Sequence, residues 1–312
     1  MGLRFFVTGK DGQLGRCLVR RLAAPGEATL VGAIDLGEVD VGDRDAVMGL
    51  FDDLAEGPPD LLVNAAAFTA VDRCESEPET AMRVNGEAPQ HLAELCRGAG
   101  TRLVHVSTDY VFDGASAEPY DEKAVPAPCN AYGRSKLEGE QRVLAASPDF
   151  LVVRTSWLYG PGPNFVGAIL RQARLRAKGE VEEPLKVVDD QHGCPTFAAD
   201  LAEGLIALAT AVGNPSGRGG LYHLCNAGAT TWWDFARAIL DLCGFGALEI
   251  ERGRTRDLDL PAPRPAWSVL DCSRAAGLGV GLRGWREALE CFLLSPDGKA
   301  LVEGNAPAEG NA

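Results

Sequence analysis

The sequence predicts an α/β protein with a doubly wound parallel sheet and a second, smaller domain. Short apolar runs alternate with helical patterns through the first half of the 312-residue chain, beginning at residues 3–8. A glycine-rich turn joins this first run to the first helix. The second half loses the regular alternation after a turn-rich loop at 160–165. Alternating strands and helices are typical of a parallel sheet with helices on both faces.

Each predicted element of the first half follows from its pattern. Apolar runs of strand length are separated by longer amphipathic stretches, which read as helices. Crossovers between parallel strands are right-handed, so the carboxyl ends of the strands meet at one edge of the sheet. The predicted strands are 3–8, 29–34, 60–64, 102–107 and 150–154, and the predicted helices are 13–23, 44–54, 78–98 and the one that begins near 132.

The later elements are less regular and predict a discontinuous smaller domain. The larger domain is expected to comprise residues 1–156 plus about 185–228, and the smaller one about 157–184 plus 229–294. The last stretch, 295–312, is rich in Gly, Ala, Pro and Glu and is predicted to be a disordered tail.

Composition narrows the classes of partner. The net charge is −14, from 30 Lys and Arg against 44 Asp and Glu, which argues against nucleic acid or an anionic membrane as the main partner. No apolar run approaches the roughly 20 residues of a membrane span, and the chain enters a strand pattern at once, so a cytoplasmic protein is expected. The nine cysteines are scattered without a Cys-x-x-Cys pair, which indicates neither a disulfide framework nor a zinc site.

The first turn carries glycines at positions 9, 12 and 15. Glycine lets the backbone turn tightly and approach a pyrophosphate, while the following helix supplies N–H donors and a positive dipole end. A strand-to-helix position at the first crossover favours dinucleotide binding by Gly9, Gly12 and Gly15. The alternative is a purely structural turn.

Two aspartates after the second strand are candidates for the nucleoside end of a cofactor. Asp35 follows the second predicted strand, where a carboxylate would bond the ribose hydroxyls of NAD and repel a 2′-phosphate unless a cation offsets it. Asp40 and Val41 are candidates for the adenine side. Both aspartates would equally suit a solvated loop, so the choice between NADPH and NADH stays open.

Tyr132 and Lys136 lie four residues apart at the start of a predicted helix. Residues at this spacing share a helix face, so the ammonium can lower the pKa of the phenol and make it useful for acid–base catalysis. Thr108, at the end of a strand, could hydrogen-bond a substrate carbonyl beside this tyrosine. The alternatives are a surface Tyr–Lys pair and a strand-end cap.

Several strings, in order along nearly the whole chain, resemble one family. They are residues 9–15 (GKDGQLG), 63–67 (VNAAA) with Thr69 and 71–72, 107–112 (STDYVF), 132–136 (YGRSK), 154–157 (RTSW), 189–196 (DDQHGCPT), 220–224 (GLYHL), and Arg264-Pro265 with Ser268 and Leu270. Together they resemble the extended short-chain dehydrogenase/reductases, which have a Rossmann-type sheet, and within them the dTDP-4-dehydrorhamnose reductase family.

The resemblance implies reduction of the 4-keto group of dTDP-4-dehydro-L-rhamnose to dTDP-L-rhamnose by NADPH or NADH. By this similarity Tyr132 donates a proton, Lys136 binds the nicotinamide ribose and Thr108 polarises the ketone. Asp109 and Trp157 match positions that contact the sugar. Positions that match cofactor contacts are Gly12, Gln13, Leu14, Asp35, Asp40, Val41, Ala67, Phe68, Thr69 and Val106.

The substrate diphosphate has its own candidate, Arg264, because a guanidinium binds phosphate oxygens in a bidentate manner. The alternative is an arginine on an exposed loop. Some members of the family use a glutamate just after the glycine motif in a magnesium-linked dimer. Cys17 stands at that place here, and a thiol is a poor magnesium ligand. No metal is therefore predicted, and a homodimer is left open.

Two other functions fit the same residues. A reductase or epimerase acting on another nucleotide-linked 4-keto-6-deoxy sugar would keep the same catalytic set. A regulatory subunit could bind a nucleotide without turning it over, although such a protein has no need for Thr108, Tyr132 and Lys136 together.

Overall fold

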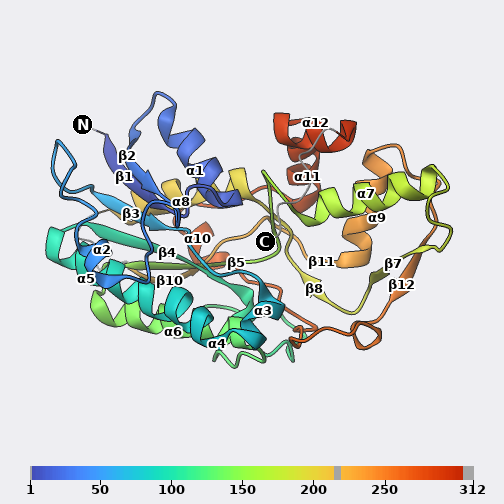
Figure 1. Cartoon of the computed structure of the whole chain (residues 1–312), viewed down its shortest axis with the longest axis horizontal. Helices are drawn as coiled ribbons and strands as arrows, with labels where there is room; N and C mark the ends of the chain where they lie inside the picture. Colours follow the sequence, from blue (N-terminus) through green and yellow to red (C-terminus); the bar gives the residue numbers. More distant parts are fainter. Residues whose placement is uncertain (1, 214–218, 305–312) are drawn as a thin grey trace.

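The computed structural model describes residues 2–213 and 219–304 (Figure 1). Its main layer is a six-stranded parallel sheet in the order β10-β5-β4-β3-β1-β2. Chain order reverses between β1 and β3, which in such sheets is where ligands bind, outside the carboxyl ends of the strands. The predicted doubly wound fold is confirmed. The strands are β1 (Leu3–Thr8), β2 (Ala28–Ile34), β3 (Leu61–Asn64), β4 (Arg102–Thr108), β5 (Leu151–Thr155) and β10 (Gly220–His223).

Helices cover both faces of this sheet (Figure 1). On one face, α1 (Gln13–Ala23) and α8 (Ala198–Val212) share an apolar core with the central strands. On the other face lie α2 (Arg44–Met48), α5 (Ala88–Ala99) and α6 (Ala131–Ala146). Burial on both faces explains why the strands read as continuous apolar runs.

Two predicted helices of the first half differ from the structure. The helix predicted over 44–54 ends with α2, where Gly49 is the C-cap. The helix predicted over 78–98 is α4 (Pro78–Ala81), a π-helical segment η1 (Met82–Glu87) and then α5. Single π-helical turns are found often at functional sites because they re-aim a side chain. The short α3 (Val71–Ser76) and the 3₁₀ turn η2 (Asp109–Val111) complete this half.

A second apolar core belongs to the smaller part, on the right of Figure 1. It contains side chains of α7 (Phe165–Ala177), α9 (Trp232–Leu242) and α11 (Trp285–Leu294). β7 (Leu185–Val188) pairs with β12 (Ile250–Gly253) in a separate two-stranded sheet. The predicted boundary assigned residues from about 185 to the larger domain. We group β7 with the smaller part instead, because Leu185 and Val187 pack in this second core.

Several elements of two to four residues complete the fold. None of them was predicted from the sequence, since elements this short carry no periodicity. They are β6 (Leu158–Tyr159), β8 (His192–Gly193), β9 (Thr196–Phe197), β11 (Thr230–Thr231), η3 (Thr255–Asp257) and α10 (Ser273–Ala276).

The prediction of a disordered tail is wrong for α12 (Pro296–Glu303), and the predicted stretch 305–312 lies outside the described residues. Ser295 caps this helix, accepting a hydrogen bond from the N–H of Gly298, and Pro296 occupies its first turn. Asp297 forms an ion pair with Arg20 of α1 at 3.0 Å. Docking of this kind orders a chain end that composition alone marks as disordered. Within the described ranges, no helix is long and apolar enough to cross a membrane.

Candidate functional site

The glycine turn sits at the carboxyl end of β1. Gly9 has a φ of +77°, and a Cβ there would lie 2.6 Å from the nitrogen of Ala66. A Cβ on Gly15 would lie 1.9 Å from the carbonyl oxygen of Gly9. Gly12 is the N-cap of α1, and a Cβ there meets nothing closer than 3.4 Å. Gly9 and Gly15 are therefore required by the fold, whereas Gly12 leaves space in front of the helix N-terminus.

Asp35 ties the end of β2 to this turn. Its Oδ2 accepts a hydrogen bond from the N–H of Asp11 at 2.9 Å. Glu38 lies beside it, accepts from the N–H of Asp35 and binds Lys10 at 2.6 Å. The lysine beside the turn is thus already paired with a carboxylate.

Asp40 and Val41 differ in their surroundings. Asp40 accepts from the N–H of Gly42 at 2.9 Å and forms an ion pair with Arg83 at 2.7 Å. These two contacts hold the half-exposed Asp40 side chain in place. Val41 is buried in the core beneath α2 and α5.

The loop after β3 is held by Asn85, which lies in the π-helical segment. Its Oδ1 accepts from the N–H of Phe68 at 2.8 Å, and its Nδ2 donates to the carbonyl of Phe68 at 3.0 Å. The same Nδ2 is 3.0 Å from the Ser135 hydroxyl on α6. Asn85 therefore sets the distance between the predicted cofactor positions Ala67, Phe68 and Thr69 and the helix of Tyr132.

The central group consists of Thr108, Tyr132 and Lys136. Thr108 ends β4, and the other two lie on the first turns of α6, which Asn130 caps by accepting from the N–H of Gly133 at 2.8 Å. Lys136 is buried, and its Nζ donates to the carbonyl of Val106 on β4 at 2.7 Å. The three residues thus lie at the carboxyl end of β4 and on the first turns of α6.

The pKa values in this group are set mainly by burial. Burial raises the pKa of Tyr132, and its hydrogen bond with Thr108 acts in the opposite direction. The expectation that Lys136 lowers this pKa is therefore wrong for the chain in this structure. Burial also lowers the pKa of Lys136 to about 8, with Glu140 opposing it. Tyr132 is protonated at neutral pH, which suits a proton donor.

Asp109 is a buried carboxyl group next to Thr108. Its Oδ1 accepts from the Thr108 hydroxyl at 3.0 Å, while its Oδ2 is buried with no hydrogen-bond partner. Burial raises its pKa to about 6, with Ser268 and Thr108 partly offsetting that rise. Buried polar atoms without partners are uncommon in folded proteins and point to a ligand or a water.

Trp157 has an unusual backbone, with a φ of 46°, the one positive value at a non-glycine residue in the described part of the chain. Its indole stacks on that of Trp232. A Cβ on Gly193 would lie 2.3 Å from the Trp157 ring, so only glycine leaves room there. Side chains from the smaller part therefore fix a residue at the end of β5. Strain of this kind tends to occur at functional sites.

Arg264 lies close to the site but is already paired. Its Nη2 is 2.8 Å from Oδ2 of Asp72 at the start of α3, and its Nη1 donates to the carbonyl of Ala262. The side chain is mostly buried, so the alternative of an exposed loop arginine is wrong. Binding a diphosphate would require this guanidinium to leave Asp72 or to share it.

Sequence analysis missed a buried group behind Lys136. Glu140 lies one helical turn further along α6 and forms an ion pair with Arg154 of β5 at 2.6 Å. The Ser107 hydroxyl also donates to Glu140. The spacing of Glu140, four residues after Lys136, was a signal that could have been used.

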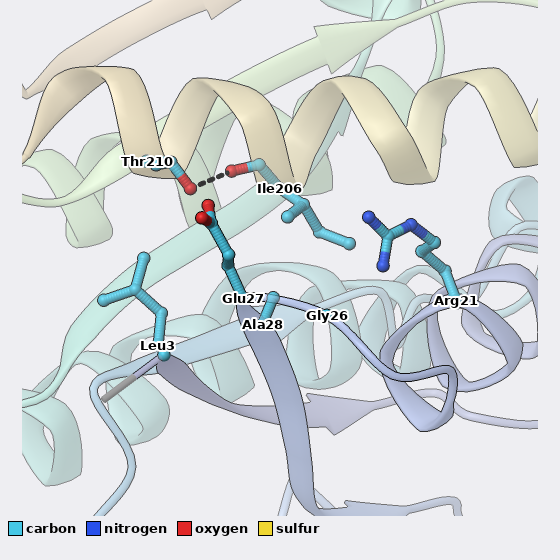
Figure 2. A pocket seen from close by; sticks show the side chains of 8 residues that line it. Leu3, Arg21, Gly26, Glu27, Ala28, Ile206 and Thr210 are labelled. Atoms are coloured by element: carbon cyan, nitrogen blue, oxygen red, sulfur yellow. Dashed lines mark hydrogen bonds between the residues drawn. The ribbon is translucent and has the colours of Figure 1, made fainter.

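Cys17 and a cavity beside α1 do not take part in this group. Cys17 is buried in the core of α1, and burial raises its pKa to about 11. A cavity of about 630 Å³ lies at the opposite, amino-terminal ends of β1 and β2. Leu3, Arg21 and Glu27 are among the side chains that line it (Figure 2). Across residues 2–213 and 219–304, no three His, Cys, Asp or Glu side chains are grouped as a metal site.

The glycine turn and Asp35 lie beside the point where the strand order of the sheet reverses, and α6 carries Tyr132 and Lys136. This arrangement fits a nicotinamide dinucleotide. The fold and this site define an extended short-chain dehydrogenase/reductase. A family model described as the RmlD substrate binding domain matches residues 3–295. The chain belongs to this family, that of the dTDP-4-dehydrorhamnose reductases.

Named relatives agree with this assignment. A dTDP-4-dehydrorhamnose reductase of Streptomyces griseus is 46% identical, over 92% of this chain and 91% of the relative. A probable dTDP-4,6-dihydroxy-2-methyloxan-3-one 4-ketoreductase of Streptomyces antibioticus is 44% identical, over 92% and 93%. The crystal structure of a dTDP-4-dehydrorhamnose reductase from Bacillus anthracis in complex with NADP is similar with a TM-score of 0.85 and 33% identity, over 94% and 99% of the two chains.

Proposed function

We propose that this protein reduces the 4-keto group of dTDP-4-dehydro-L-rhamnose to give dTDP-L-rhamnose. The observation that carries the proposal is the group of Thr108, Tyr132 and Lys136 beside a dinucleotide-type glycine turn in a member of this family. A nicotinamide dinucleotide, when bound, supplies the hydride that the keto carbon accepts.

The residues then have distinct roles. Thr108, whose hydroxyl donates to Asp109 in this structure, would turn that hydrogen bond to the keto oxygen and so polarise the carbonyl. Tyr132, kept protonated by burial, donates its phenolic proton to the oxygen as negative charge develops there. Lys136 would hold the nicotinamide ribose, and its ammonium would stabilise the phenolate that forms on Tyr132.

Other residues hold the two ligands. The pyrophosphate is received by the turn at Gly9–Gly15, with Gln13 and Leu14. The adenine-side ribose is bound by Asp35. The adenine is contacted by Asp40 and Val41. Asp109 and Trp157 contact the sugar, and Arg264 contacts the diphosphate. The substrate is a dTDP-linked sugar, and the homodimer that the sequence left open is a question for sedimentation.

A second substrate is favoured by one observation, the 44% identical relative named as a ketoreductase of a different dTDP-linked keto sugar. The decisive experiment follows the nicotinamide absorbance with dTDP-4-keto-L-rhamnose and with other dTDP-4-keto-6-deoxy sugars, for the wild type and for Tyr132→Phe. The rhamnose precursor should be reduced with the highest kcat/KM, and Tyr132→Phe should lose about 10²- to 10⁴-fold in kcat while binding the cofactor normally.

Tyr110→Phe is the matched control, since that ring packs against Tyr132 with centroids 5.7 Å apart. It should keep most of the activity. Full activity of Tyr132→Phe would overturn the assignment of the proton donor. Faster turnover of another keto sugar would move the substrate to that sugar, and tight cofactor binding without turnover of any sugar would indicate a regulatory subunit.

A further inference from the structure

Lys136 is an ammonium group in a place that disfavours charge. Its side chain is about 2% exposed, and its Nζ donates to a single carbonyl, that of Val106. A buried lysine tends to lose its proton, because the charged form is poorly solvated there. A neutral amine at this place would not stabilise a phenolate, and it would have two N–H donors where the ammonium has three.

Glu140 lies one turn along α6 and has a fully defined position. Its Oε1 accepts from the Ser107 hydroxyl at 2.5 Å and from Nε of Arg154 at 2.8 Å, and its Oε2 accepts from Nη2 of Arg154 at 2.6 Å. Glu140 and Arg154 are each about 2% exposed. Ser107 points to α6, on the face opposite to that of Thr108, which agrees with the alternation of a strand.

On the side away from Glu140, the guanidinium of Arg154 has a neighbour as well. Nη1 of Arg154 is 3.5 Å from Nε2 of His223, whose Nδ1 is 3.0 Å from the carbonyl of Tyr120. Burial, aided by Arg154, lowers the pKa of His223 to about 4, so this imidazole is neutral. Glu140 is thus bound by Arg154, with a neutral imidazole on the far side of that arginine.

Stability alone does not explain a buried ion pair at this position. Replacing such pairs with apolar residues is often neutral or stabilising, because removing two charges from water costs about as much as their attraction returns. Glu140 lies on the turn of α6 that follows Lys136, four residues along, so the two side chains share one helix face and the carboxylate favours the charged form of the lysine.

We propose that Glu140 is a positioning residue for Lys136, held by Ser107 and Arg154 so that its carboxylate keeps the buried lysine charged. The inference deepens the proposed function, on which it rests for the role of Lys136. The other ionisable groups around Lys136 are Tyr132 on α6, His105 on β4, which burial keeps neutral, and Arg154 behind Glu140 on β5.

The test compares pH profiles of the full-length enzyme. In Glu140→Gln, Lys136 should lose its proton at lower pH, so the alkaline fall of kcat moves down by about one pH unit or more. Cofactor affinity, measured by nicotinamide fluorescence without any sugar, should fall with pH over the same shifted range. Because this binding measurement uses no sugar, it tests the role of Glu140 even if the assigned substrate is wrong.

Three further variants keep the test interpretable. Glu140→Gln with Arg154→Met removes both buried charges, so it should fold even if the single variant does not, and it should show the same shift. Ser107→Ala removes one of the two groups that hold the carboxylate but leaves its charge and its bond to Arg154, so its alkaline limb should move less than that of Glu140→Gln. In Lys136→Met the alkaline fall in cofactor affinity should disappear. An alkaline limb that stays in place in both Glu140 variants, with or without a uniform loss of rate, would overturn the proposal.

Discussion

The indole rings of Trp157 and Trp232 lie face to face, with centroids 3.6 Å apart and planes 5° from parallel. Trp157 follows the last residues of β5, and Trp232 begins α9 in the smaller part, so this stack joins the sheet edge to the second core. It also supports Trp157 in a left-handed backbone conformation.

Trp232→Ala should therefore release Trp157 and weaken substrate binding. We expect KM for the sugar to rise about tenfold, which corresponds to about 1.4 kcal/mol, with an unchanged cofactor Kd. Trp233→Ala is the matched control, because that ring faces Arg252 at 3.8 Å on the neighbouring position of α9. Steady-state kinetics would check both. An equal rise of KM in the two variants would show that the stack has no special role.

Asp35 should control the choice between the two nicotinamide cofactors. Its carboxylate faces the turn, and the nearby Lys10 is already paired with Glu38, so a 2′-phosphate meets negative charge there. Asp35→Ser should raise the ratio of kcat/KM for NADPH to that for NADH by about tenfold. Asp43→Ser, which removes the same charge at the N-cap of α2, should leave the ratio unchanged. A ratio that stays constant in Asp35→Ser would place the ribose elsewhere.

The buried carboxylate of Asp109 should lower the free energy of unfolding at neutral pH. Its folded pKa of about 6 lies above the unfolded value of about 4, so the stability it contributes is complete below about pH 4 and is lost as the pH rises through about 6. Asp109→Asn should thus be more stable than the wild type near pH 7, by about 2 kcal/mol, and should bind the sugar less well.

Thermal unfolding at several pH values checks this prediction. The Tm difference between Asp109→Asn and the wild type should shrink as the pH falls from about 6 to about 4. Asp113→Asn is a control of opposite sign, because hydrogen bonds from Ala115 and Tyr120 lower the pKa of that exposed carboxyl group. A lower Tm of Asp109→Asn at neutral pH would contradict the argument.

Gly15 and Gly12 should respond differently to alanine. In Gly15→Ala the new Cβ meets the backbone of Gly9 at 1.9 Å, so we expect a loss of about 2 kcal/mol in the free energy of unfolding. In Gly12→Ala the nearest atom is at 3.4 Å, so the fold should be kept while the cofactor, which needs that space, binds less tightly. Denaturant unfolding and cofactor titration separate the two effects. Equal stability of both variants would argue against the close packing at Gly15.

Much of this protein could be predicted from its sequence, because the signals are local. The apolar runs at Leu3–Thr8 and 102–107 required burial on both faces, which a parallel sheet provides. The spacing of Tyr132 and Lys136 placed them on one helix face whatever else the chain did. The capping residues of α12, Ser295 and Pro296, are local signals too, and they favour the helix where composition predicts a disordered tail.

Only the tertiary structure decided the surroundings of these residues. Whether Lys136 lowers the pKa of Tyr132 depends on burial, which comes from every element packed around α6, and burial raises it instead. The partners of Arg264 and Glu140 lie 192 and 14 residues away in sequence, and the stack of Trp157 on Trp232 joins two cores. Periodicity describes the face of one helix or strand, whereas charge, desolvation and ring contacts depend on which faces meet, and that is a property of the folded chain.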